Sequence, residues 1–191
     1  VASAAVSAMP FTACGWFNAD VATGTDTLFA IGDGTADNQW NLQASGAVAG
    51  DPVSVYCEAG GSFQRTDATT GFTAETWHFA SLVVTSATSR RVGIDGGSFA
   101  TGATSLSPSG VNKTTFGQAT DGTKDYDGKL AEFAVWNVAL TDAEVAQLAK
   151  GMSPLYVQPQ NIVAYWPLVG RADPEPDMLG TYHLTVTGAT L

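Results

Sequence analysis

The chain has 191 residues and a formal net charge of −10, and 45% of its residues are hydrophobic while only 14% are charged. This length and composition favour one large domain with a single core over residues 1–191, and they exclude a disordered chain. Eighteen acidic residues stand against eight basic ones, with Arg90 and Arg91 as the sole adjacent basic pair. Nucleic acid is therefore not expected as a partner, because binding its phosphates requires clustered cations. No apolar run approaches the roughly 18 residues of a membrane helix, so membrane insertion is not expected either.

Short strands are predicted throughout the first third of the chain. Runs rich in β-branched and aromatic residues alternate with Gly, Asp, Asn and Ser, which is typical of an all-β sandwich or barrel. In the first run, FTACGWFNA at 11–19, odd-numbered residues share one face and even-numbered residues the other. Further strands are predicted at 26–32, 40–44 and 52–60, with a turn at 32–39.

Two cysteines, Cys14 and Cys57, lie inside these strand-like runs. The sequence leaves open whether they are buried thiols or a disulfide, because a disulfide requires Cα atoms about 4.4 to 6.8 Å apart. The cysteines therefore assign no cellular compartment.

The middle of the chain contains its most apolar run and its clearest turn. WHFASLVV at 77–84 is predicted to be a central strand. Asp95-Gly96 lies between two alternating runs and predicts a type I′ hairpin, because both central residues of that turn need positive φ. Asp95 is interpreted first as a turn residue, with ligand binding as the alternative. Residues 114–136 then give a strand, an acidic loop and another strand.

One short α-helix is predicted at 142–150. Thr141 and Glu144 have the spacing of a capping box, and Leu140 and Val145 that of a hydrophobic staple. Gly151 is expected to supply the left-handed end. A helix this short needs a sheet to lie on. The predicted buried stripe consists of Val145, Leu148, Ala149 and Met152.

Three closing strands are predicted after the helix, at 155–158, 161–170 and 182–191. The Pro-rich segment 171–177 is expected to be a loop between the last two. No period of roughly 20 to 50 residues repeats, so a repeat array is excluded.

Five segments occur in an order that resembles a known family. They are FTACGW, ETWHFASLVV, VGIDGG, DYDGKLAEFAVWNVALTDAEVAQLAKG and IVAYWPL. In this order they are similar to the laminin G-like jelly rolls of the concanavalin A-like lectin/glucanase superfamily, and the ending PQNIVAYWPLVG resembles its bacterial and phage branch. The resemblance implies an all-β fold, a two-sheet antiparallel jelly-roll β-sandwich with the short helix near 142–150.

Catalysis is not expected from these residues. Retaining glucanases of the superfamily carry an E-x-D-x-x-E strand, because their chemistry needs two carboxylates about 5 to 5.5 Å apart. No two Glu residues of this chain lie within five positions of each other, and Asp125 and Asp127 alternate without a third partner. The two histidines, His78 and His183, accompany no GxSxG or HExxH motif. The chain is therefore predicted not to be an enzyme.

Calcium is the candidate ion, although no cofactor is required. Laminin G-like and pentraxin-like relatives often bind calcium through rim loops, and calcium takes about six to eight oxygen ligands. The same acidic residues also suit tight turns for backbone reasons alone, so both interpretations stay open. The candidate metal ligands are Asp33, Asp37, Asp121, Asp125 and Asp127.

Two aromatic residues lie among polar residues that suit a sugar. Sugar sites stack an exposed aromatic ring on the pyranose and surround it with polar groups. Trp40 closely follows Asn38, and Tyr126 directly follows Asp125, so these four residues are the candidate ligand-binding site. The remaining tryptophans are expected in the core; they are Trp16, Trp77, Trp136 and Trp166.

Three functional hypotheses follow from the resemblance and the missing catalytic motif. The leading one is a non-catalytic recognition or display module on the outside of a cell or virus particle, which binds a glycan or another surface ligand through its rim loops. The alternative is a structural virion protein, a phage capsid-decorating or fibre-associated subunit that packs against neighbouring subunits and binds no sugar. A glycoside hydrolase is the third. The expected location is extracellular or the virion surface.

Overall fold

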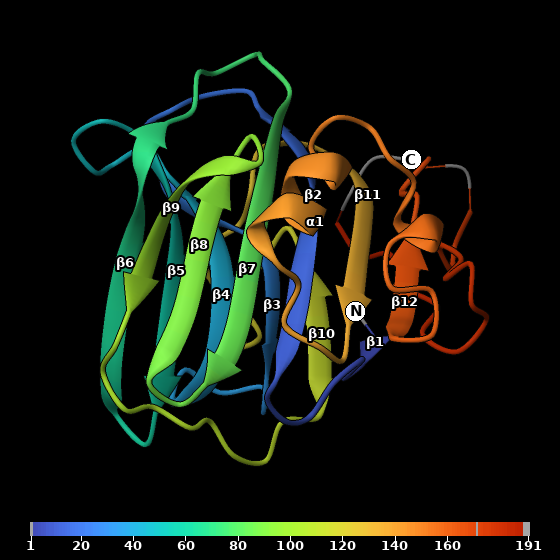
Figure 1. Cartoon of the computed structure of the whole chain (residues 1–191), viewed down its shortest axis with the longest axis horizontal. Coiled ribbons are helices and arrows are strands. Elements are labelled where there is room, and N and C mark those ends of the chain that lie inside the picture. Colours follow the sequence, from blue (N-terminus) through green and yellow to red (C-terminus); the bar gives the residue numbers. More distant parts are fainter. Residues whose placement is uncertain (1, 171, 189–191) are drawn as a thin grey trace.

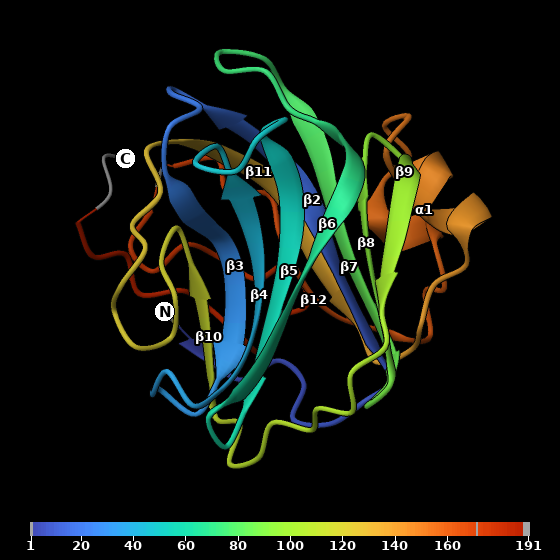
Figure 2. The ribbon, with the colours of Figure 1, turned by 90° about the vertical axis from the view of Figure 1, so that its left-hand side faces the viewer.

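The computed structural model describes residues 2–170 and 172–188, and it shows two antiparallel sheets stacked as a sandwich (Figure 1). Sheet A, which faces the viewer in Figure 2, has the order β1 (Ala2–Ser3), β10 (Lys113–Phe116), β3 (Thr25–Gly32), β4 (Asn38–Ser45), β5 (Pro52–Ala59) and β6 (Ser62–Gly71). Sheet B has the order β12 (Ile162–Trp166), β11 (Gly128–Trp136), β2 (Phe11–Ala19), β7 (His78–Ser86), β8 (Ser89–Ile94) and β9 (Gly97–Gly102). The predicted fold class, a two-sheet antiparallel β-sandwich with one short helix, is confirmed.

The core lies between the two sheets, and strand β2 shows how the alternation of its sequence forms it. Phe11 and Phe17 are fully buried in this central core, whereas Cys14 belongs to a second cluster. The Phe11 ring meets Trp40 of β4 edge-on, with ring centroids 5.2 Å apart. The two faces predicted for 11–19 are therefore confirmed, and the central core joins sheet A to sheet B.

The helix α1 (Asp142–Leu148) lies over sheet B, outside the central core (Figure 1). Its capping box is confirmed: the Thr141 hydroxyl accepts from the Glu144 amide, and the Glu144 carboxylate accepts from the Thr141 amide at 2.8 Å. Val145 and Leu148 are buried against β2, β7, β11 and β12 in the second cluster. Met152 is 41% exposed, so its predicted place on the buried stripe is wrong, because the helix ends at Leu148 and Gly151 turns the chain with φ +89°.

The predicted hairpin joins β8 to β9, and Asp95 and Gly96 both have positive φ. The Asp95 carboxylate accepts from the Phe79 amide at 2.9 Å and bonds to His78 Nδ1 at 2.8 Å. His78 Nε2 accepts from the Thr73 amide, which leaves Nδ1 as the ring nitrogen that faces Asp95. Both residues hold the start of β7 in place, and the turn predicted at Asp95-Gly96 is confirmed.

Two predicted strands are absent and one tryptophan is misplaced. Residues 155–158 are not a strand: the 3₁₀ turn η1 (Pro154–Tyr156) covers the first two of them. In the described part of 182–191 only Leu184 forms a bridge, to Glu175, and residues 189–191 lie outside the described residues. Trp77 is 44% exposed because β7 begins one residue after it, which corrects its predicted core position.

The two cysteines are free thiols, buried in different clusters. Cys57 lies in the central core, and Cys14 lies on the helix side of sheet B, where burial raises the pKa of its thiol. Of the two alternatives left open by the sequence, the structure contains the buried thiols. No helix in the described residues is long and apolar enough to cross a membrane.

Candidate ligand-binding groove

The register of sheet A places a set of polar side chains on the face that points away from the core. On β4, Trp40 and Leu42 enter the core, so Gln39, Asn41 and Gln43 point outward. Residues paired across a ladder share a face of the sheet. The partners of this row are therefore also outward: Glu58, Tyr56 and Ser54 on β5, and beyond them Phe63, Arg65 and Asp67 on β6.

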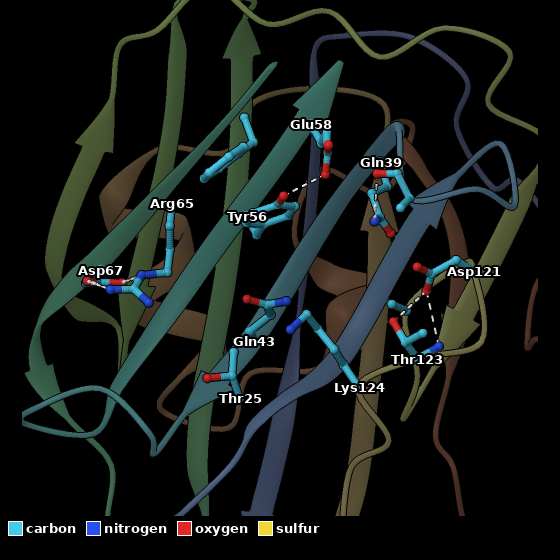
Figure 3. A pocket seen from close by; sticks show the side chains of 13 residues that line it. Thr25, Gln39, Gln43, Tyr56, Glu58, Arg65, Asp67, Asp121, Thr123 and Lys124 are labelled. Carbon is cyan, nitrogen blue, oxygen red and sulfur yellow. Dashed lines mark hydrogen bonds and ion pairs between the residues drawn. The ribbon is translucent and has the colours of Figure 1, made fainter. Parts of the chain in front are cut away.

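Except for Asn41 and Ser54, these side chains line a cavity of about 560 Å³, called here the sheet A groove (Figure 3). Its floor comes from β4 and β5, with Gln39, Gln43 and Tyr56 in view. The far wall is β6, and the near wall is the loop between β10 and β11. In Figure 3 the side chain of Lys124, from that loop, extends over the floor toward Gln43.

Several buried polar atoms on this face lack a hydrogen-bond partner among the described residues. Gln43 is 1% exposed and its Nε2 is unpartnered, and the same holds for both side-chain atoms of fully buried Asn41. Two hydroxyls beside them, Thr27 Oγ1 and Ser45 Oγ, are also unpartnered. A buried polar group without a partner costs about 1–3 kcal/mol. The outward face of sheet A therefore has buried polar atoms that are free to hydrogen-bond, and of these residues Gln43 lines the groove.

An aromatic pair forms the upper part of the groove. The rings of Tyr56 and Phe63 stack with centroids 5.5 Å apart and planes inclined by 26°, and Phe63 is 63% exposed. The Tyr56 hydroxyl donates to Glu58 at 2.6 Å. Burial, together with this bond to a carboxylate, raises the pKa of Tyr56. The pair offers an apolar surface edged by a fixed hydroxyl and carboxylate.

The charges of the groove are largely paired within it. Arg65 Nε lies 2.9 Å from Asp67 Oδ1, and Asp67 also accepts from Ser54. Asp121 accepts from the amide and hydroxyl of Thr123. Lys124 takes part in none of the ion pairs of the described residues. Three carboxylates and two cations line the groove, so it has no cationic excess for an anion.

The residues predicted to bind a ligand are not gathered in this groove. Trp40 is 1% exposed and packs on Phe11, so the expectation of an exposed sugar-stacking ring is wrong; β4 begins at Asn38, and the alternation turns Trp40 inward. Asn38 binds Asp33 through Nδ2 and accepts from the Ser109 amide through Oδ1, so its side chain holds loops together. Tyr126 packs on the core, and burial raises its pKa. Asp125 is exposed and accepts from Gln118.

The five predicted calcium ligands remain spread over separate turns. Asp33 accepts hydrogen bonds from the amide and hydroxyl of Thr35. Burial acts to raise the pKa of Asp33, but these hydrogen bonds outweigh it and lower that pKa. Asp121 has the equivalent bonds to Thr123. Among residues 2–170 and 172–188, no three His, Cys, Asp or Glu side chains converge as a metal site. Calcium also takes backbone carbonyls, so calcium binding at Asp33, Asp37, Asp121, Asp125 and Asp127 stays a prediction.

The sequence contains a signal for the groove in two of its predicted strands, outside the loops that supplied most of the candidate residues. NQWNLQAS alternates amide or hydroxyl residues with core residues, and the next strand repeats this with Ser54, Tyr56 and Glu58. Polar side chains at alternate positions of two adjacent strands indicate a polar sheet face, and such a face is a candidate binding surface where other segments cover it.

Comparisons with known proteins place the fold. The family model described as the concanavalin A-like lectin/glucanases superfamily matches residues 1–146. A search of curated proteins finds no match. Among solved structures, a protein from Bacteroides ovatus, provisionally described as carbohydrate binding, has a TM-score of 0.68 and 18% identity over 94% of this chain and 52% of its own. The chain thus spans about half the length of that protein.

Two further similar structures were solved with oligosaccharides. Domain 4 of an extracellular arabinanase from Geobacillus stearothermophilus, in complex with arabinotriose, has a TM-score of 0.62 and 17% identity, covering 77% of this chain and 69% of its own. The CBM40 of the IT-sialidase from Ruminococcus gnavus, bound to α2,3-sialyllactose, has a TM-score of 0.64 and 16% identity, covering 75% and 84%. At these identities the likeness shows the fold.

Proposed function

Since the chain belongs to the concanavalin A-like lectin/glucanases superfamily, we propose that it is a non-catalytic glycan-binding module whose binding surface is the sheet A groove. The observation that carries this proposal is Gln43, which lines the groove and whose buried side-chain nitrogen has no hydrogen-bond partner among the described residues. A glycan hydroxyl both donates and accepts, so it would recover the free energy that the unpartnered amide costs.

The aromatic pair supports the same function. The exposed face of Phe63 beside Tyr56 suits the apolar side of a sugar ring, while Glu58 and the Tyr56 hydroxyl supply polar contacts at its edge. An apolar platform with fixed polar groups is the usual composition of a small-ligand site. The similar structures solved with arabinotriose and sialyllactose support a glycan as the ligand class.

The ligand we propose is a neutral glycan. Arg65 is engaged by Asp67, and the groove carries one carboxylate more than it has cations. A sialic acid would bring a carboxylate to a surface of like charge, on a chain with a net charge of −10. The groove carboxylates accept from neighbouring side chains, and no E-x-D-x-x-E strand is present, so the function proposed is binding and not hydrolysis.

The proposed location is extracellular or on a particle surface, where neutral polysaccharides are exposed. The structural virion subunit and subunit partners remain predictions without a specific observation in their favour. The unpartnered Gln43 nitrogen in the groove is the observation that supports the glycan-binding hypothesis.

A glycan array carrying neutral and sialylated oligosaccharides, followed by calorimetry with the best-bound glycan, tests the proposal. We expect the protein to bind neutral glycans. Gln43→Leu should reduce this binding, and Gln147→Leu should leave it unchanged, because Gln147 is an exposed residue of α1 outside the groove. Binding of sialylated glycans alone would contradict the neutral class while keeping the groove, provided Gln43→Leu still removes it. No binding to any glycan, with and without calcium, would overturn the proposed function.

A further inference from the structure

A second cavity, of about 200 Å³, lies on the opposite side of the molecule, between sheet B and the C-terminal end of α1. Strand residues form its floor: Cys14 and Trp16 from β2, Phe79 from β7, Glu132 from β11 and Tyr165 from β12. Leu148 and the segment 151–154 cover it from the helix side. It shares no lining residue with the sheet A groove.

Glu132 is the single acidic residue of this lining, and its backbone is strained. It has φ +55° in the middle of β11, where the register with β2 shifts between Ala131 and Ala134. The left-handed region is unfavourable for a residue with a Cβ, and such strain is concentrated at functional positions. The bulge interrupts the alternation of β11 at the point where Glu132 contributes to the cavity.

The Glu132 carboxylate is fixed but not neutralised. It accepts a hydrogen bond from the Tyr165 hydroxyl, whose pKa is raised by burial and by this carboxylate. It takes part in none of the ion pairs formed by the described cationic side chains. Apart from Ser153 and this pair, the lining is aromatic, aliphatic, sulfur-containing or glycine. A carboxylate in such surroundings is best stabilised by a cation that carries its own apolar groups.

The aromatic residues of the cavity suit the same ligand. Trp16 and Phe79 meet edge-to-face with centroids 5.4 Å apart and planes inclined by 68°, and Tyr165 adds a third ring. Aromatic faces attract organic cations, most strongly at desolvated sites. Calcium and magnesium do not fit this lining, because they need several oxygen ligands and one carboxylate is available.

We propose that this cavity binds the ammonium group of an organic cation, with Glu132 as its counter-ion and the rings of Trp16, Phe79 and Tyr165 as its aromatic contacts. The inference is independent of the sheet A groove, because the cavity lies on the other sheet and its proposed ligand is a cation with apolar groups, not a neutral glycan. The ligand class is an alkylammonium or quaternary ammonium compound with an apolar body small enough for the cavity.

The test is a titration of the full chain followed by NMR at the Trp16 indole N–H. Tetramethylammonium and n-butylammonium chloride are the cationic probes, and tert-butanol and n-butanol are their neutral counterparts of similar shape. We expect saturable shifts with at least one cation, with a dissociation constant on the order of 1 mM, and no saturation with either alcohol. Binding of the quaternary probe alone supports a cation–π site, and binding of the primary amine alone supports direct hydrogen bonding to Glu132.

Two variants and one control make the test decisive. Glu132→Gln keeps the shape and the bond from Tyr165 but removes the charge, and it is expected to weaken cation binding at least tenfold. Tyr165→Phe, which releases the carboxylate, is expected to weaken it less. Glu75→Gln, the same charge change outside the cavity, is expected to have no effect. Equal binding of cations and alcohols, no saturable shift with either cation, or an unchanged affinity in Glu132→Gln would overturn the inference, while an unchanged melting temperature shows that the variant is folded.

Discussion

Gln43 pairs with Thr27 across the β3–β4 ladder, and each side chain has a buried polar atom, Nε2 and Oγ1, without a hydrogen-bond partner among the described residues. The two atoms lie on the outward face of the same sheet, one strand apart. Stability alone does not explain such a pair, because apolar residues of similar size would avoid the cost. A surface that sacrifices stability in this way is typical of a binding site.

The first prediction is that replacing Gln43 lowers glycan affinity without lowering stability. Gln43→Leu removes the unpartnered amide while filling its volume, so the free energy of unfolding is expected to stay level or to rise by up to about 1 kcal/mol. Glycan affinity is expected to fall about tenfold or more. Urea unfolding and calorimetry on one preparation measure both quantities. A variant that is both less stable and fully competent to bind would contradict this account of sheet A.

The second prediction concerns the aromatic platform. Phe63→Ala removes a ring that is 63% exposed, so stability is expected to change little, whereas glycan affinity is expected to fall several-fold through the loss of about 0.5–1.5 kcal/mol of stacking. Val169→Ala, at a side chain that is 60% exposed and outside the groove, is the matched control. Equal effects of the two substitutions on affinity would remove Phe63 from the site.

A third prediction follows from the capping box. The Thr141 amide bonds to Glu144, and this bond, with the bond from Gln158, lowers the pKa of Glu144 against the opposing effect of burial. A carboxyl whose pKa is lower in the folded state stabilises the protein above its unfolded pKa, near 4.5, and that contribution is lost as pH falls through the folded value. The stability difference between wild type and Glu144→Gln is therefore expected to be constant above pH 4.5 and to shrink below it. Urea unfolding over a pH series measures it, and a difference that persists at low pH would assign the effect to packing.

A fourth prediction tests the packing of the core at β2. A Cβ at Gly15 would lie 2.3 Å from the Phe133 ring, which is fully buried, so Gly15→Ala is expected to cost about 1–3 kcal/mol. Gly97→Ala is the control, because a Cβ there meets nothing within 4 Å. Thermal unfolding should separate the two variants clearly. Similar melting temperatures would mean that the ring moves without cost.

The sequence predicted the parts of the fold that are governed by local rules. The capping box at Thr141, the turn at Asp95-Gly96 and the alternation of 11–19 each depend on residues close in the chain, and all three are confirmed. Of the three closing strands, the one predicted at 161–170 is confirmed as β12, whereas those at 155–158 and 182–191 are wrong, because their apolar runs resemble strands. In the first of these two segments the chain forms the η1 turn, which begins at Pro154. In the second it forms the Glu175–Leu184 bridge.

The candidate site was harder to predict because it is made by pairing, not by a motif. Trp40 was predicted at the first position of a strand, beside a polar turn, but β4 begins two residues earlier, at Asn38, and its alternation directs Trp40 into the core. The groove gathers one row from each of three strands, and only the register brings Gln43, Tyr56 and Arg65 onto one face. The cavity at Glu132 depends on a bulge with no distinctive sequence, so no local pattern could have indicated it.

The placement of the five tryptophans gives the protein a built-in optical label. None of them lines the sheet A groove, and Trp40, Trp136 and Trp166 are fully buried, so a neutral sugar should leave the intrinsic fluorescence almost unchanged. Trp16 lines the cavity beneath α1, where an ammonium ion in contact with its ring should quench or shift the emission. A single fluorimeter titration can therefore tell which face of the sandwich a compound occupies.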